Sequence, residues 1–218
     1  MSEKPILFSG PMIRALLDGR KTQTRRVLKM PKWAQSSGWP DRIMDEQELD
    51  GSLGWFDKDT GCLARLPFAQ PGDRLWVREA HAIFPRLAYR GSIGVGTIDQ
   101  REHPTDGYSA AVFREGFDRS GRPRWRPSIH MPRWASRLTL TVTDVRAQRV
   151  QEISEADAID EGCRPFFDKD NPKVMTGPNG TEHSMAPLLG PVDDFRRLWD
   201  SLNDARGFGW EANPWVVA

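Results

Sequence analysis

An eight-residue segment near the N-terminus carries four basic side chains and two hydroxyl groups. Its sequence is Gly19-Arg20-Lys21-Thr22-Gln23-Thr24-Arg25-Arg26. A Thr hydroxyl becomes a nucleophile when a base lies beside it, and a Lys amine can be that base when burial or nearby cations lower its pKa. Arginines can bind a substrate or stabilise an oxyanion, and the segment offers Arg20, Arg25 and Arg26. The alternative is a solvated basic turn without a catalytic role.

A carboxylate in an unfavourable place is the second candidate. Ser154 and Asp157 have the spacing of a capping box, and they predict a helix that Gly162 ends. Glu161 lies in its last turn, where the negative end of the helix dipole opposes a carboxylate by a few tenths to about 1 kcal/mol. A solvated glutamate tolerates this position at little cost. A partly buried glutamate could instead hold a proton and donate it.

A predicted strand over residues 74–81 carries polar side chains that could contact a ligand. Leu75 and Val77 alternate with Trp76, as in a half-buried strand, and Glu79 and His81 lie near its end. A carboxylate at a strand end is usually solvated, so the alternative for Glu79 is a surface role. Trp76 offers a flat surface for a nucleobase.

The segment 125–134 combines aromatic, basic and proline residues. Its prolines exclude a regular interior strand. Three of its side chains are candidates for binding a planar, polar ligand: His130, Arg133 and Trp134. The alternative is that His130 only fixes the conformation of a loop.

The elements that must position these residues alternate with long irregular stretches. Strands are predicted at 5–8, 74–81, 108–114, 138–145 and 209–217, and helices begin at about 10, 154 and 191. The first and third helices carry apolar stripes that are predicted to be buried: Ile13, Leu16, Leu17, Phe195, Leu198, Trp199 and Leu202. Insertions are predicted at about 30–67 (with a short hairpin), 85–134 and 163–190 of a single domain that spans 1–218.

Charge and cysteine content limit the classes of function. The chain has 218 residues with 31 basic and 30 acidic side chains, so nucleic acid would need a local basic patch. Cys62 and Cys163 show neither metal-site spacing nor a disulfide-rich pattern, which favours a reducing compartment. No cluster of His, Cys and Asp suggests a metal, and we expect no cofactor. There is no signal-peptide pattern or apolar run of about 20 residues, so we expect a cytoplasmic protein without a membrane partner. No protein partner is implied.

Three motifs resemble those of the ASCH domain, a member of the PUA-like superfamily. They are Gly-Arg-Lys-Thr-x-Thr-x-Arg at 19–26, Gly-Asp-x-Leu-x-Val at 72–77 and Ile-Ser-Glu-x-x-Ala-x-x-Glu-Gly at 153–162. The chain is most similar in type to ASCH proteins of phages and prophages with a Trp-rich C-terminal end. The resemblance implies a β-rich α+β fold, a small and mostly antiparallel β-barrel with peripheral helices.

At the basic segment the chain also resembles the small bacterial ASCH enzyme that hydrolyses N4-acetylcytidine. This resemblance implies catalytic roles for Lys21, Thr24 and Glu161 and a metal-free amidohydrolase that acts on an N4-acylated cytosine nucleoside. Thr24 would be the nucleophile or would position a water molecule, and the cytosine would stack on Trp76 or Trp134. In an extended chain Lys21 and Thr24 point to opposite faces, so the hypothesis requires a bend between them.

Two other functions stay open. The first is an RNA- or DNA-binding module, because PUA-like domains are associated with RNA and Arg and Trp alternate within 122–137. The second is a ribonuclease. The nearly balanced charge favours a small substrate over a long polyanion.

Overall fold

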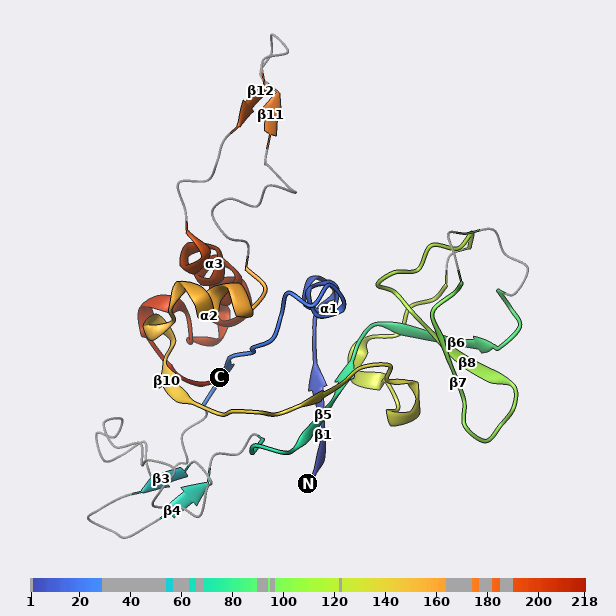
Figure 1. Ribbon diagram of the computed structural model, residues 1–218, viewed down its shortest axis with the longest axis horizontal. Coiled ribbons are helices and arrows are strands. Elements are labelled where there is room, and N and C mark those ends of the chain that lie inside the picture. The colour runs from blue at the N-terminus through green and yellow to red at the C-terminus, as the bar shows by residue number, and fades with distance from the viewer. Residues whose placement is uncertain are drawn as a thin grey trace. The chain divides into compact units, whose positions relative to one another are not determined.

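The computed structural model describes residues 2–28, 54–56, 63–65, 69–89, 94, 97–121, 123–163, 174–176, 182–184 and 190–218 (Figure 1). These residues fall into two compact units. The first unit comprises Met1–Asp18 and Ala69–Thr143, and the second comprises Gly19–Phe68 and Asp144–Ala218. Cys62, whose spacing from Cys163 was considered above, lies outside the described residues. No helix in the described ranges is long and apolar enough to cross a lipid bilayer.

The first unit contains two small sheets. Its elements are β1 (Glu3–Leu7), α1 (Gly10–Leu17), β5 (Arg74–Arg78), β6 (His81–Pro85), β7 (Gln100–Glu102), β8 (Ser109–Phe113), the 3-10 turns η3 (Ser128–His130) and η4 (Arg133–Ala135), and β9 (Thr139–Thr141). One sheet has the order β1-β5-β9, with β1 parallel to β5, and the other has the antiparallel order β6-β8-β7. As predicted, Leu75 and Val77 alternate inward along β5.

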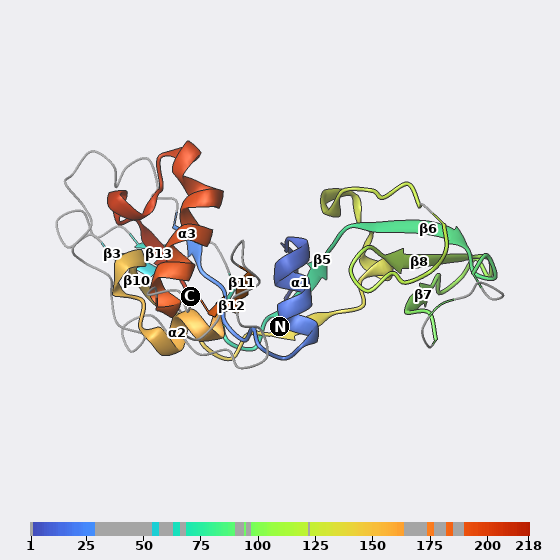
Figure 2. The same ribbon diagram turned by 90° about the horizontal axis from the view of Figure 1, so that it is seen from above.

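The second unit joins a three-stranded sheet to two helices (Figure 2). Its elements are β2 (Arg26–Val27), β3 (Gly54–Phe56), β4 (Leu63–Arg65), β10 (Ala147–Arg149), η5 (Val150–Glu152), α2 (Glu155–Asp160), β11 (Val174–Thr176), β12 (Glu182–Ser184), α3 (Pro191–Asn203), η6 (Asp204–Arg206), η7 (Trp210–Ala212) and β13 (Trp215–Val217). The sheet has the antiparallel order β10-β13-β2, and β3 pairs with β4 as β11 does with β12.

The core of the second unit lies between this sheet and the helices. Val27 and Val216 are directly opposite each other, so their side chains share one face of the sheet. Both pack in the cluster that contains Ala158 of α2 and Phe195 and Trp199 of α3. The helices therefore cover that face.

The predicted α+β class is confirmed. In the described residues β1 and β5 form the one parallel pair, and none of the sheets closes on itself. The short hairpin expected within 30–67 corresponds to β3 and β4. The β11–β12 pair lies within the predicted insertion 163–190, for which no strand was predicted.

Strand lengths differ from the prediction where pairing sets them. The predicted strand 138–145 shortens to β9, because its partner β5 is paired only from Trp76↔Thr139 to Arg74↔Thr141. β7 was not predicted because its Gln-Arg-Glu sequence has no alternating apolar pattern, and it forms an edge strand beside β8. β6 and β10 were likewise missed.

Both predicted helical stripes are wrong at their C-terminal residue. Leu17 ends α1 and is 45% exposed, because the helix is buried at Ile13 and Ala15 instead. Leu202 of α3 is 46% exposed, and the buried side chains follow the i, i+4 series Phe195, Trp199 and Asn203. Asn203 is satisfied there because its Nδ2 donates to the Trp199 carbonyl at 3.1 Å.

Two substitutions on one helix test this assignment of buried and exposed positions. Ile13→Ala should lower the free energy of unfolding by about 2–5 kcal/mol, because it leaves a cavity at a fully buried site. Leu17→Ala should change it by less than about 0.5 kcal/mol. Urea unfolding followed by circular dichroism measures both. Equal losses for the two variants would contradict the assignment.

Candidate active site

Lys21 is buried at the C-terminal end of α2. Its side chain is 1% exposed, and its Nζ donates to Glu161 Oε2 at 2.7 Å. The same ammonium donates to the backbone carbonyls of Glu161, at 2.9 Å, and of Gln23, at 2.7 Å. A lysine and a carboxylate from distant parts of the chain therefore form a buried ion pair.

Backbone hydrogen bonds fix the segment that carries Lys21. The amides of Thr22 and Gln23 both donate to the Asp160 carbonyl, at 2.8 and 3.0 Å. That carbonyl is one of those which the end of a helix leaves without an intrahelical partner. Gly19 and Gly162 adopt positive φ angles of 69° and 91°, which lets the chain leave α1 and α2 where these contacts require it.

This arrangement explains why Glu161 is tolerated at a helix C-terminus. Glu161 is the C-cap residue of α2, where the helix dipole disfavours a carboxylate. Lys21 contacts both its carboxylate and its carbonyl, so a cation lies at the negative end of the helix. Glu161 thus lies where the helix dipole disfavours a carboxylate, but the Lys21 cation compensates its negative charge.

Arg25 supplies a second buried cation. Its Nη1 lies 3.3 Å from Glu161 Oε1, and its Nη2 lies 3.0 Å from Asp157 Oδ2. The guanidinium also donates to Gln23 Oε1 at 2.5 Å and lies over the Phe195 ring. Glu161 therefore has a different cation on each carboxylate oxygen.

The buried position changes how several groups titrate. Burial lowers the pKa of Lys21, against the opposing effect of Glu161, and Arg26 lowers it further. Burial also lowers the pKa of Arg26, again opposed by Glu161. Burial raises the pKa of the Cys163 thiol to about 12, with Glu161 acting in the same direction. Cys163 is therefore a protonated thiol and a poor nucleophile.

Asp157 is the other anion of the network. Burial raises its pKa, but hydrogen bonds from Arg146 and Gln23 and the charge of Arg25 together hold that pKa well below its usual range. Arg146 Nη2 donates to Asp157 Oδ1 at 2.9 Å, and Gln23 Nε2 donates to the same oxygen at 3.1 Å. Gln23 and Asp157 were not predicted as site residues, because the capping-box pattern already explained Asp157.

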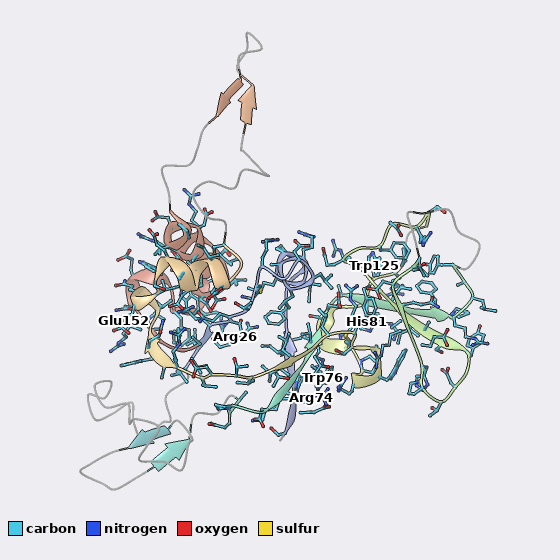
Figure 3. All side chains as sticks on the ribbon, in the orientation of Figure 1. Arg26, Arg74, Trp76, His81, Trp125 and Glu152 are labelled. Atoms are coloured by element: carbon cyan, nitrogen blue, oxygen red, sulfur yellow. The ribbon has the colours of Figure 1, made fainter. Side chains whose placement is uncertain are left out.

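The other residues of the basic segment are more accessible. Thr24 and Arg26 are half-buried, and Arg20 is exposed, with its Nη1 3.5 Å from the Gly162 carbonyl. The segment from Arg20 to Arg25 has no regular secondary structure. No turn or bend is found among residues 20–25 either, so the structure does not show the bend that the hypothesis requires between Lys21 and Thr24. Figure 3 labels Arg26 beside the helices of the second unit.

The remaining predicted site residues belong to the first unit. Trp76 is half-buried, and the guanidinium carbons of Arg78 and Arg133 lie 5.1 and 5.7 Å from the centre of its ring. Trp134 makes an edge contact with His103 at 4.6 Å between ring centroids, and His130 is exposed. Figure 3 labels Trp76 and Arg74 on β5.

Glu79 is fully buried in an ion pair that the sequence did not predict. Arg137 Nε and Nη2 each donate to one of its carboxylate oxygens at 2.8 Å. Burial raises the pKa of Glu79, and the hydrogen bonds from Arg137 oppose this. His81, also fully buried, has its Nδ1 3.2 Å from the Glu79 carbonyl, and burial lowers its pKa.

A cavity of about 510 Å³ lies beside the start of α1 in the first unit. Phe8, Ile13, Glu79 and Arg114 line it together with an ion pair of Arg14 and Glu115. The volume suits a small polar molecule. Its charges neutralise one another, so the lining does not select one chemical class of ligand.

The described residues contain no group of three His, Cys, Asp or Glu side chains that could hold a metal ion. Comparisons of the chain with protein-family models, with curated proteins and with solved structures give no significant match. The ASCH resemblance therefore stays a prediction that rests on the three sequence motifs.

A double-mutant cycle tests whether Lys21 and Glu161 act as one buried pair. Lys21→Met and Glu161→Gln should each lower the free energy of unfolding by about 3–5 kcal/mol, because each removes one member of a buried ion pair. The double variant should lose less than the sum, with a coupling energy of about 1–3 kcal/mol in urea unfolding.

The exposed pair of Arg196 and Glu211 is the control within the same unit. Its coupling energy in the same cycle should be below about 1 kcal/mol. Additive losses for Lys21 and Glu161 would show that the two side chains do not depend on each other.

Proposed function

We propose that the second unit contains the active site of a metal-free amidohydrolase that removes the acyl group from N4-acylated cytosine nucleosides. We also propose that the chain has an ASCH, PUA-like fold. One observation carries this proposal: Lys21 and Glu161, both buried, lie 2.7 Å apart with two further arginines beside them. A buried lysine with a lowered pKa, in direct contact with a carboxylate, is typical of sites that transfer protons.

Hydrolysis of the amide requires a base, a proton donor and a stabiliser of the oxyanion. Lys21, as the free amine, takes the proton from the attacking oxygen as that oxygen bonds to the acyl carbon. The proton then passes to Glu161, whose Oε2 is within hydrogen-bond distance of Nζ. Glu161 delivers it to N4 of cytosine as the C–N bond breaks. The products are the cytosine nucleoside and a carboxylic acid.

The attacking oxygen belongs either to Thr24 or to water. Attack by Thr24 forms an acyl-threonine, which a water molecule then hydrolyses, whereas direct attack by water releases the acid in one step. Arg26 is the cation proposed for the developing oxyanion, because it is half-buried on the segment that carries Thr24. The exposed Arg20 can bind the ribose or its substituents.

Release of cytidine from N4-acetylcytidine, followed by chromatography, tests the proposal. Wild-type protein should release cytidine, and Lys21→Met and Glu161→Gln should each lower kcat/KM by at least about 100-fold, as expected for loss of a general base or acid. Lys4→Met is the control, because Lys4 forms a partly exposed ion pair with Asp73 in the first unit. Its activity should equal that of wild type.

The pH profile of the same reaction identifies the base. Because the free amine of Lys21 is active, the rate should rise as pH rises through its pKa, and burial places this midpoint below the ordinary value for lysine. A folded wild-type protein that hydrolyses none of several N4-acyl cytosines would refute the proposal.

Binding of single-stranded RNA is the second candidate, and an uneven distribution of charge favours it. Residues 1–18 and 69–143, the first unit, hold 14 Lys and Arg against nine Asp and Glu, whereas the rest of the chain holds 17 against 21. Among the described residues of the first unit, eight arginines are exposed: Arg14, Arg74, Arg86, Arg101, Arg114, Arg124, Arg126 and Arg133. Between two of them, Trp125 is held by an edge contact with Phe117 (Figure 3).

Salt dependence tests this second candidate. If the first unit binds RNA, the affinity for a fluorescent single-stranded RNA should fall steeply with salt, by a log–log slope of about −0.7 for each phosphate contact. The double variant Arg124→Ala/Arg126→Ala should make that slope smaller, and Arg196→Ala in the second unit should not. Weak binding with no salt dependence would exclude this function.

A further inference from the structure

Arg25 is a fully buried cation that joins two carboxylates of α2. It contacts Asp157 at 3.0 Å and Glu161 at 3.3 Å. These two residues are four positions apart, so their side chains lie on the same face of the helix end. A guanidinium is planar and keeps its charge, so it can hold two carboxylates in a fixed orientation that a flexible ammonium would not impose.

Glu161 divides its two oxygens between two cations. Oε2 faces Lys21 and Oε1 faces Arg25. An opposite charge nearby favours the protonated form of a lysine, and a like charge disfavours it. Arg25 therefore makes Glu161 less effective at stabilising the protonated form of Lys21. Its contact with Oε1 also keeps Oε2 directed at Nζ.

We propose that Arg25 is a positioning residue, braced by Asp157, which orients Glu161 and allows Lys21 to release its proton. The catalytic meaning of this inference rests on the proposed function. The effect on the proton of Lys21 is independent of any substrate, because it depends only on the buried charges of the unbound protein.

Other titratable groups that act on Lys21, Asp157 or Cys163 must be considered with Arg25. They come from α2 and the turn after it, from the segment around β2, from α3 and from the chain before β10: Asp157, Glu161, Cys163, Arg26, Asp194 and Arg146. Cys163 is uncharged because burial raises the pKa of its thiol. Arg26 is thus the cation that lowers the pKa of Lys21, and Glu161 is the anion that contacts Lys21. Arg25 lies on the other oxygen of Glu161 and acts on Lys21 through that carboxylate.

An NMR titration of the full-length protein with ¹³C-labelled lysine measures the Lys21 proton directly. The Lys21 signal is assigned by its loss in Lys21→Met. In Arg25→Met the titration midpoint of Lys21 should rise by about one pH unit, because Glu161 then faces Lys21 alone. In Arg25→Lys, which keeps the charge, the rise should be smaller. A folded Arg25→Met protein with the wild-type midpoint would overturn the inference.

Asp157→Asn gives an opposite test that does not require Arg25 to be removed. The substitution removes the negative charge of Asp157, so Arg25 then has Glu161 as its carboxylate partner. The titration midpoint of Lys21 should therefore fall. A rise, or no change, would overturn the inference even if Arg25→Met fails to fold.

The hydrolysis assay separates this inference from the proposed function. If wild type hydrolyses N4-acetylcytidine, the rising part of the pH–rate profile should move with the NMR midpoint in Arg25→Met, and activity should recover at higher pH. If the midpoint moves but wild type hydrolyses no N4-acyl cytosine, the proposed function fails and the positioning role of Arg25 stands.

Discussion

The buried ion pair of Lys21 and Glu161 is the interaction on which the second unit depends. Removing two charges from water is costly, and the protein recovers this cost only through good geometry and additional hydrogen bonds. Two backbone carbonyls accept hydrogen bonds from the ammonium, and Arg25 contacts the second carboxylate oxygen. The end of α2, the two glycine turns and the amides of Thr22 and Gln23 are all arranged around this pair.

Local signals in the sequence predicted the helices well, because each helix begins and ends with residues that act within one turn. Ser154 caps α2 as predicted, with Asp157 N donating to its Oγ at 3.1 Å. Leu17 and Leu202 show the limit of such reasoning. Helical spacing says which side chains share a face, but where the neighbouring chain stops decides which of them are covered.

Contacts between distant parts of the chain could not be predicted from spacing. Lys21 and Glu161 are 140 residues apart, and only the family resemblance suggested that they belong together. The pairing of Glu79 with Arg137 had no sequence signal, since neither residue lies in a motif that requires the other. The net charge of the whole chain was also a misleading guide to its charge distribution. The first unit has an excess of basic residues and the second an excess of acidic residues, and the two excesses nearly cancel.

The attachment of the basic segment to the end of α2 has a consequence for synthesis of the chain. Residues 20–25 leave the ribosome early, but the Asp160 carbonyl and the Glu161 side chain that fix them are made about 140 residues later. Contacts of such large sequence separation form late, because loop closure must come first. In a nascent chain Lys21 is therefore exposed and charged, like an ordinary lysine. It becomes buried, and its pKa is lowered, only after the C-terminal half has folded.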